Sequence, residues 1–71
     1  MHRENIFDEL RRLESEVVEG ERRLAEQEAL VVALKKRDVD RTEAEAVLEM
    51  MRRSQQQLDQ DRQRLLSLLR P

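Results

Sequence analysis

The acidic side chains are the first candidates for catalytic groups in this chain. The chain contains 16 Asp and Glu, and paired carboxylates serve enzymes as general acids and bases. Three of them, Glu14, Glu21 and Glu28, recur every seven residues, which is the spacing of charges beside the seam of a coiled coil. We interpret them as a solvated helix face. Ion pairs four residues apart are expected at Asp8–Arg12, Glu19–Arg23 and Glu49–Arg53.

Other requirements of catalysis and metal binding are missing from the sequence. There is no Cys, and the only His, His2, has no second histidine with which to hold a metal. No histidine lies near the serines in the sequence to activate them as nucleophiles. Gly20 is the only glycine, so a phosphate-binding glycine loop cannot form. We predict that the chain is not an enzyme and binds neither a cofactor nor a metal.

One basic cluster is a candidate anion contact. It consists of Lys35, Lys36, Arg37 and Arg41. Its charge can bind phosphate or stabilise the carboxyl end of a helix, and we favour the second interpretation. The net charge is −2 and Phe7 is the only aromatic residue, so the chain lacks both a strong basic footprint and a stacking platform for bases. We do not expect nucleic acid as a partner, and a Rop-like RNA-binding bundle is the alternative.

The apolar residues of the first half predict one long helix. They recur at alternating steps of four and three, which is the spacing of a heptad seam. The seam comprises Ile6, Leu10, Leu13, Val17, Gly20, Leu24, Gln27, Val31 and Leu34. Asn5 is placed to accept hydrogen bonds from the free amides at the start, and the bases that follow Leu34 suit a helix end. We predict a helix over about 6–37.

A turn is predicted at about 38–42. If the first helix continued, charged residues would occupy three successive seam positions. Two overlapping capping boxes, Asp40 with Glu43 and Thr42 with Glu45, can start a new helix here. A single uninterrupted helix is the competing interpretation, since neither Gly nor Pro marks a break, but the charged seam makes it costly.

The second half predicts a helix over about 43–69, antiparallel to the first. Its apolar residues share one broad face, which Ser54–Gln55 and Asp61–Arg62 interrupt. That face comprises Ala44, Val47, Leu48, Met51, Leu58, Leu65, Leu66, Leu68 and Leu69. Matching the two helices end to end places Gly20 close to Leu58, which would explain a glycine in mid-helix.

A hairpin of these helices leaves apolar surface uncovered. The first helix carries a second apolar strip, offset by roughly 100° from its seam, formed by Val18, Ala25, Ala29 and Val32. Two helices bury one stripe each, whereas four bury two-sided faces around a shared core. A chain of this length also needs a source of stability beyond its own core. Without Cys or a metal site, oligomerisation is the one that remains.

We therefore predict an all-α fold, in which residues 1–71 form a single coiled-coil-like, two-helix antiparallel hairpin that dimerises into a four-helix bundle. The residues predicted to form the core and the dimer interface are Leu10, Leu13, Val17, Gly20, Leu24, Val31, Leu34, Val47, Leu48, Met51, Leu58, Leu65 and Leu69. The parallel and antiparallel arrangements of the hairpins both stay open.

The predicted function is that of a small protein-interaction or structural module whose partner is a second copy or another helical protein. No apolar run approaches the roughly 18 residues that a membrane span requires. Residues 1–4 also lack the apolar segment of a secretory signal. We therefore expect a cytoplasmic location and no membrane partner.

Three segments resemble a group of small uncharacterised alphaproteobacterial helical-hairpin proteins. They read VVEGERRLAEQ at 17–27, DRTEAEAVL at 40–48 and RQRLL at 62–66. The group shares V-x-E-G-E-x-H-I-x-x-Q, a D-T loop, A-x-x-L-L and a closing R-x-R-L-L. This chain has Glu16 and Arg23 where histidines are usual, and it lacks the usual loop glycine. The resemblance implies a bacterial helical hairpin and brings no known activity.

Overall fold

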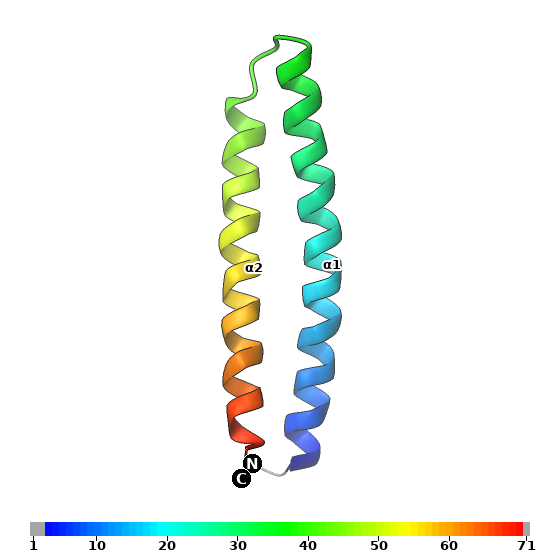
Figure 1. The fold of residues 1–71 in the computed structure, drawn as a ribbon, viewed down its shortest axis with the longest axis vertical. Helices are drawn as coiled ribbons and strands as arrows, with labels where there is room; N and C mark the ends of the chain where they lie inside the picture. Colours follow the sequence, from blue (N-terminus) through cyan, green and yellow to red (C-terminus); the bar gives the residue numbers. More distant parts are fainter. Residues whose placement is uncertain (1–2, 71) are drawn as a thin grey trace.

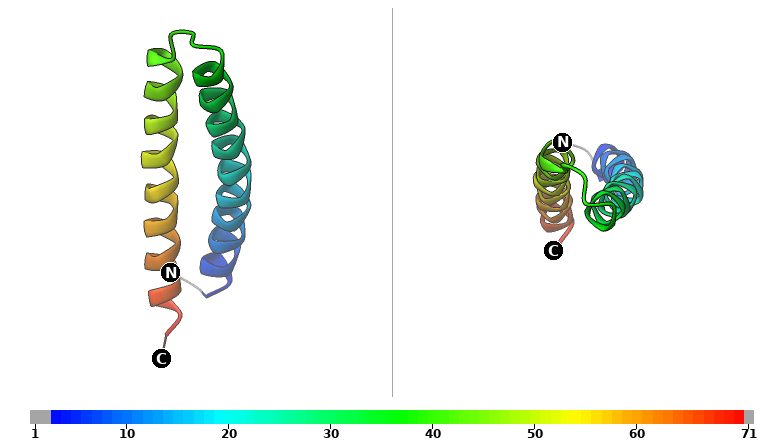
Figure 2. Two further views of the ribbon diagram at one scale, coloured as in Figure 1. Left: turned by 45° about the horizontal axis from the view of Figure 1, so that its top comes forward. Right: turned by 90° about the horizontal axis from the view of Figure 1, so that it is seen from above.

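The computed structural model describes residues 3–70 and shows two antiparallel helices joined by a short turn (Figure 1). Helix α1 spans Arg3–Lys36 and helix α2 spans Thr42–Leu68. The molecule measures 53 × 15 × 14 Å, and the two helices lie side by side in every view (Figures 1 and 2). A continuous helix would be about 100 Å long at 1.5 Å per residue. The predicted all-α hairpin is therefore confirmed.

The predicted seam of α1 is the side that faces α2. Ile6, Leu10 and Leu13 are buried, and every later seam position as far as Leu34 is half-buried. Helix α2 shows the same spacing of four and three, at Ala44, Leu48, Met51, Gln55, Leu58, Arg62, Leu65 and Leu69. Gln55 and Arg62 thus belong to the seam of α2 and do not interrupt it.

The core is thin and lies toward the open end of the hairpin. Ile6, Leu10, Leu13 and Leu65 form one buried cluster, and Leu48 is buried nearer the turn. Leu58, Leu66 and Leu69 pack against the cluster while staying half-exposed. Two helices have only one line of mutual contact, so most seam side chains keep one flank open to solvent.

Helix α1 ends in a backbone motif that usually contains glycine. The N–H of Val39 donates to the carbonyl of Leu34 at 3.1 Å, and the N–H of Asp38 donates to that of Lys35 at 3.2 Å. This pair of bonds is a Schellman motif, in which the residue after the helix takes a left-handed conformation. Asp38 occupies that position with φ = 55°, a conformation that Asp tolerates better than most side chains do. The helix therefore stops without a glycine.

Helix α2 starts with an Asx turn, so the two predicted capping boxes are wrong. Oδ1 of Asp40 accepts the backbone N–H of Thr42 at 3.0 Å and its hydroxyl at 2.8 Å. Glu45 pairs with Arg41 and does not bond back to Thr42. The place of the restart was predicted correctly, but the short Asp40 side chain bonds the amide two residues on. These hydrogen bonds from Thr42 lower the pKa of the Asp40 carboxyl.

The helix ends differ from the predicted bounds by one to three residues. Helix α1 begins at Arg3, so Asn5 lies inside the helix and is not its cap. The first amides of a helix can bond to water, so the helix can extend past a good capping residue. Helix α2 ends at Leu68, and the N–H of Leu69 donates to the carbonyl of Leu66 at 3.1 Å. His2 lies outside the described residues.

Candidate interaction surface

Two glutamines make the side-chain hydrogen bonds that join α1 to α2 among the side chains of residues 5–70. Nε2 of Gln27 donates to the carbonyl of Ala44 at 2.9 Å, and Nε2 of Gln55 donates to that of Val17 at 2.8 Å. Both bonds are partly buried, and each contributes about 0.5–1.5 kcal/mol. Because a hydrogen bond is directional, these two contacts define the register of the helices more sharply than leucine packing does.

Gly20 provides the space that the Gln55 amide occupies. A Cβ atom on residue 20 would lie 2.0 Å from Oε1 of Gln55 and 3.0 Å from its Cδ. The prediction that Gly20 packs against Leu58 is therefore wrong. The side chain nearest to Gly20 is that of Gln55, three residues before Leu58 and about one helical turn away. The prediction matched the apolar residues end to end, but the conformation of the turn sets where α2 begins relative to α1.

The ion pairs of the described residues all join side chains three or four positions apart. The expected Glu19–Arg23 and Glu49–Arg53 pairs are present, each at 3.3 Å. The expected Asp8–Arg12 pair is wrong, since Asp8 pairs with Arg11 at 3.6 Å and Arg12 with Glu9. All are local, so these charges stabilise single helices and do not select how the two helices pair.

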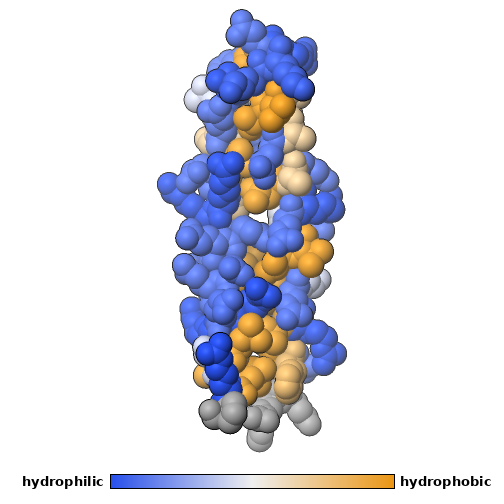
Figure 3. Space-filling view, viewed as in Figure 1, coloured by the Kyte–Doolittle hydropathy of each residue, from blue (hydrophilic) through white to orange (hydrophobic). Residues whose placement is uncertain are grey.

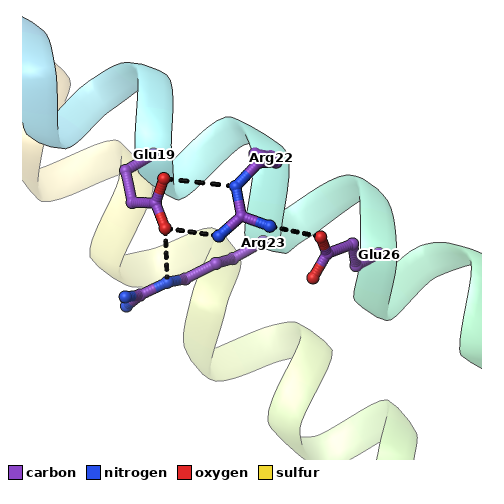
Figure 4. Close-up of polar contacts among 4 residues, drawn as sticks. All are labelled: Glu19, Arg22, Arg23 and Glu26. Carbon is purple, nitrogen blue, oxygen red and sulfur yellow. Dashed lines mark hydrogen bonds and ion pairs between the residues drawn. The ribbon is translucent and has the colours of Figure 1, made fainter.

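The densest charge cluster of the described residues lies on α1 (Figure 4). Glu19 accepts hydrogen bonds from Arg22 and pairs with Arg23, and Arg22 also reaches Glu26. The hydrogen bond from Arg22 lowers the pKa of Glu19, and the bond to Glu19 raises the pKa of Arg22. Both groups stay charged at neutral pH, so neither is suited to exchange a proton with a substrate.

Three grooves open along one side of the hairpin, which we call the groove face. Its two rows have seven-residue spacing: Glu9, Glu16, Arg23 and Leu30 on α1, and Val47, Ser54 and Asp61 on α2. The grooves have volumes of about 420, 510 and 380 Å³, and seam residues such as Leu13, Met51, Leu58 and Leu65 line them. The apolar seam is thus accessible along much of this side.

The opposite flank of the seam also has a groove. Glu14, Val17, Val18, Glu21 and Arg62 line a groove of about 430 Å³ there. Val18 is 66% exposed, and Nε of Arg62 is buried without a hydrogen-bond partner among the described residues. Figure 3 shows an apolar band along the line between the helices, with hydrophilic residues on both sides of it.

The predicted interface residues all lie at buried or half-buried positions. Leu10, Leu13, Leu48 and Leu65 are buried, and the half-buried ones are Val17, Gly20, Leu24, Val31, Leu34, Val47, Met51, Leu58 and Leu69. The structure thus brings these residues to the contact between α1 and α2. Their contact with a second copy stays a prediction.

The predicted basic cluster lies at the turn and is not a separate positive surface. Lys35, Lys36 and Arg37 are exposed, whereas Nε of Arg41 lies 2.6 Å from Oε1 of Glu45. Residues 35–45 hold four bases and four acids, so the turn has no formal net charge. An anion at the turn would therefore meet as many acidic as basic residues.

Comparison with known protein families, curated proteins and solved structures gives no match to this chain. Neither α1 nor α2 is apolar enough over a sufficient length to cross a membrane. No group of three acidic or histidine side chains within residues 5–70 is placed to hold a metal ion. The shape and chemistry of the hairpin surface are therefore the basis for a functional proposal.

Gln55 and Arg62 are the interface positions that sequence reasoning did not recognise. Both are polar, so they resembled breaks in the apolar face. The signal that could have found them is the spacing of four and three, which runs through both from Ala44 to Leu69. A seam defined by spacing alone would have included them.

Proposed function

We propose that this chain is a protein-interaction module that acts as a homodimer of hairpins in a four-helix bundle. The observation that carries the proposal is the area the hairpin leaves exposed. The chain exposes 5815 Å², whereas a compact monomer of its mass would expose about 4,650 Å². The excess of about 1,150 Å² is larger than the roughly 800 Å² that each partner contributes to a standard interface.

The exposed area includes seam residues that a second hairpin can cover. Leu24, Val31, Leu34, Met51 and Leu58 are only half-buried against the other helix. Burial of apolar surface stabilises by about 25 cal/mol per Å², so covering these side chains adds stability that one hairpin lacks. A four-helix bundle encloses such two-sided faces.

Sedimentation equilibrium from low to high micromolar concentration, together with urea unfolding, tests the proposal. The expected result is a dimer whose unfolding midpoint rises with protein concentration, because dissociation is linked to unfolding. Leu58→Asp should abolish the dimer, since a charge would be buried without a partner. Gln56→Asp introduces the same charge at an exposed position of α2 and should leave the dimer intact. A monomer that unfolds cooperatively at a midpoint independent of concentration would refute the proposal.

A further inference from the structure

We infer that the dimer forms through the groove face, with the hairpins antiparallel and Glu16 of each copy opposite Arg23 of the other. This inference rests on the proposed homodimer and adds its face and its orientation. Three independent observations carry it: the composition of the two flanks, the midpoint of α1, and the placement of two apolar seam residues.

The groove face suits contact with a copy of itself better than the other flank does. Its α1 row contains acids, Arg23 and Leu30, and its middle groove contains the small residues Ser15 and Ser54. Small side chains allow close approach of another helix. The other flank of α1 presents Glu14 and Glu21, followed seven residues later by Glu28, and a copy of that row would repel it.

The charges of the groove face favour the antiparallel orientation. The midpoint of α1, Arg3–Lys36, lies between residues 19 and 20. A two-fold axis at that point places Glu16 opposite Arg23 of the second copy, and symmetry repeats the pair. Among the side chains of residues 5–70, Glu16 has no ion pair and Arg23 pairs only with Glu19. Parallel hairpins would instead bring the acidic end of this row toward Asp61 of the other α2.

Apolar contacts agree with the same axis. Helix α2, Thr42–Leu68, has its midpoint at Gln55. Met51 and Leu58 lie on either side of it, and both line the middle groove. In the antiparallel dimer Met51 of one copy therefore lies within about one residue, 1.5 Å, of the level of Leu58 of the other. Met51 and Leu58 of each copy would then pack in the middle groove of the other copy.

Exchanging the charges of Glu16 and Arg23 tests whether the dimer forms through the groove face. Glu16→Arg and Arg23→Glu should each raise the dissociation constant by about tenfold or more, because each creates two like-charge contacts per dimer. The double variant should restore wild-type affinity, and a mixture of the two single variants should form heterodimers. Glu28→Arg makes the same charge change on the other flank and should have little effect.

A distance measurement tests the orientation. The chain has no Cys, so Arg37→Cys carries a single nitroxide label near the turn. Pulsed electron resonance should give about 50 Å between labels of an antiparallel dimer, from 35 residues at 1.5 Å. Parallel hairpins would place the labels at one end, within about 30 Å, at ordinary helix spacings.

The results separate this inference from the proposed function. A wild-type dimer that is unaffected by the single exchanges, or as sensitive to Glu28→Arg, refutes the groove face and leaves the homodimer in place. A short label distance refutes the antiparallel orientation. A wild-type monomer at high concentration refutes the homodimer and this inference together.

Discussion

Replacing Gly20 by alanine tests the contact between α1 and the Gln55 side chain of α2. A Cβ there would lie 2.0 Å from Oε1 of Gln55, so the amide must move and its 2.8 Å bond to the Val17 carbonyl is lost. That loss costs about 0.5–1.5 kcal/mol. Alanine in mid-helix gains about 0.8–1.0 kcal/mol over glycine. We therefore expect the free energy of unfolding to change by less than about 0.7 kcal/mol.

The Gln55→Ala background separates the two terms. Without the amide, Gly20→Ala should raise the free energy of unfolding by the full helix gain, about 0.8–1.0 kcal/mol, or about 4–8 °C in Tm. The double-mutant cycle should give a coupling of about 0.5–1.5 kcal/mol. Urea unfolding followed by circular dichroism, at one fixed protein concentration, measures all four variants. A full gain in both backgrounds would show that Gln55 does not depend on the space at Gly20.

Three further changes test the turn, the seam of α2 and the Asx turn. Asp38→Gly should raise the free energy of unfolding by about 0.5–1 kcal/mol, because glycine adopts φ = 55° without strain; Asp38→Ala, which keeps the Cβ, should not. Arg62→Leu should raise the free energy of unfolding by about 1–2 kcal/mol, since the unpaired Nε leaves the seam; the exposed Arg53→Leu is the control, and equal effects would contradict this account. Asp40→Asn should lower stability at pH 7, and the difference from wild type should shrink as the pH falls below about 4, because the lowered pKa of Asp40 means that its charged form stabilises the fold and protonation removes this term. A difference that is constant with pH in urea unfolding would show that the charge contributes nothing.

The hairpin was predictable because one spacing runs through each helix and fails between them. All nine seam positions from Ile6 to Leu34 are buried or half-buried. Charged residues at 38, 41 and 45 would have broken the same seam, and the turn lies there. A heptad seam can be recognised in one helix without knowing which helix packs against it, so these features follow from the residues alone.

The register and the polar seam contacts were not predictable in the same way. A shift of one turn still places leucine near leucine, so the apolar pattern does not distinguish Leu58 from Gln55 as the neighbour of Gly20. The choice depends on where Asp38 turns the chain and on a carbonyl acceptor, Val17, in the other helix. Neither the backbone conformation nor the acceptor leaves a periodic signal in the sequence.

The final prediction is that the proposed dimer has no appreciable affinity for nucleic acid at physiological salt. It would carry twice the chain's formal charge of −2, that is −4, and a phosphate backbone would meet overall repulsion. Several of its bases, including Arg22, Arg41 and Arg53, already pair with Glu side chains.

The turn is where a phosphate contact would have to form, and its four bases lie among four acids. Fluorescence anisotropy with mixed RNA and with duplex DNA should detect no binding at about 150 mM salt. A Glu43→Lys, Glu45→Lys variant, which makes the turn basic, is the positive control for the assay. Micromolar affinity of the wild-type chain that falls steeply with added salt would show that the turns present enough unpaired charge to release counterions. In that case the Rop-like RNA-binding bundle would replace protein contact as the function that the surface supports.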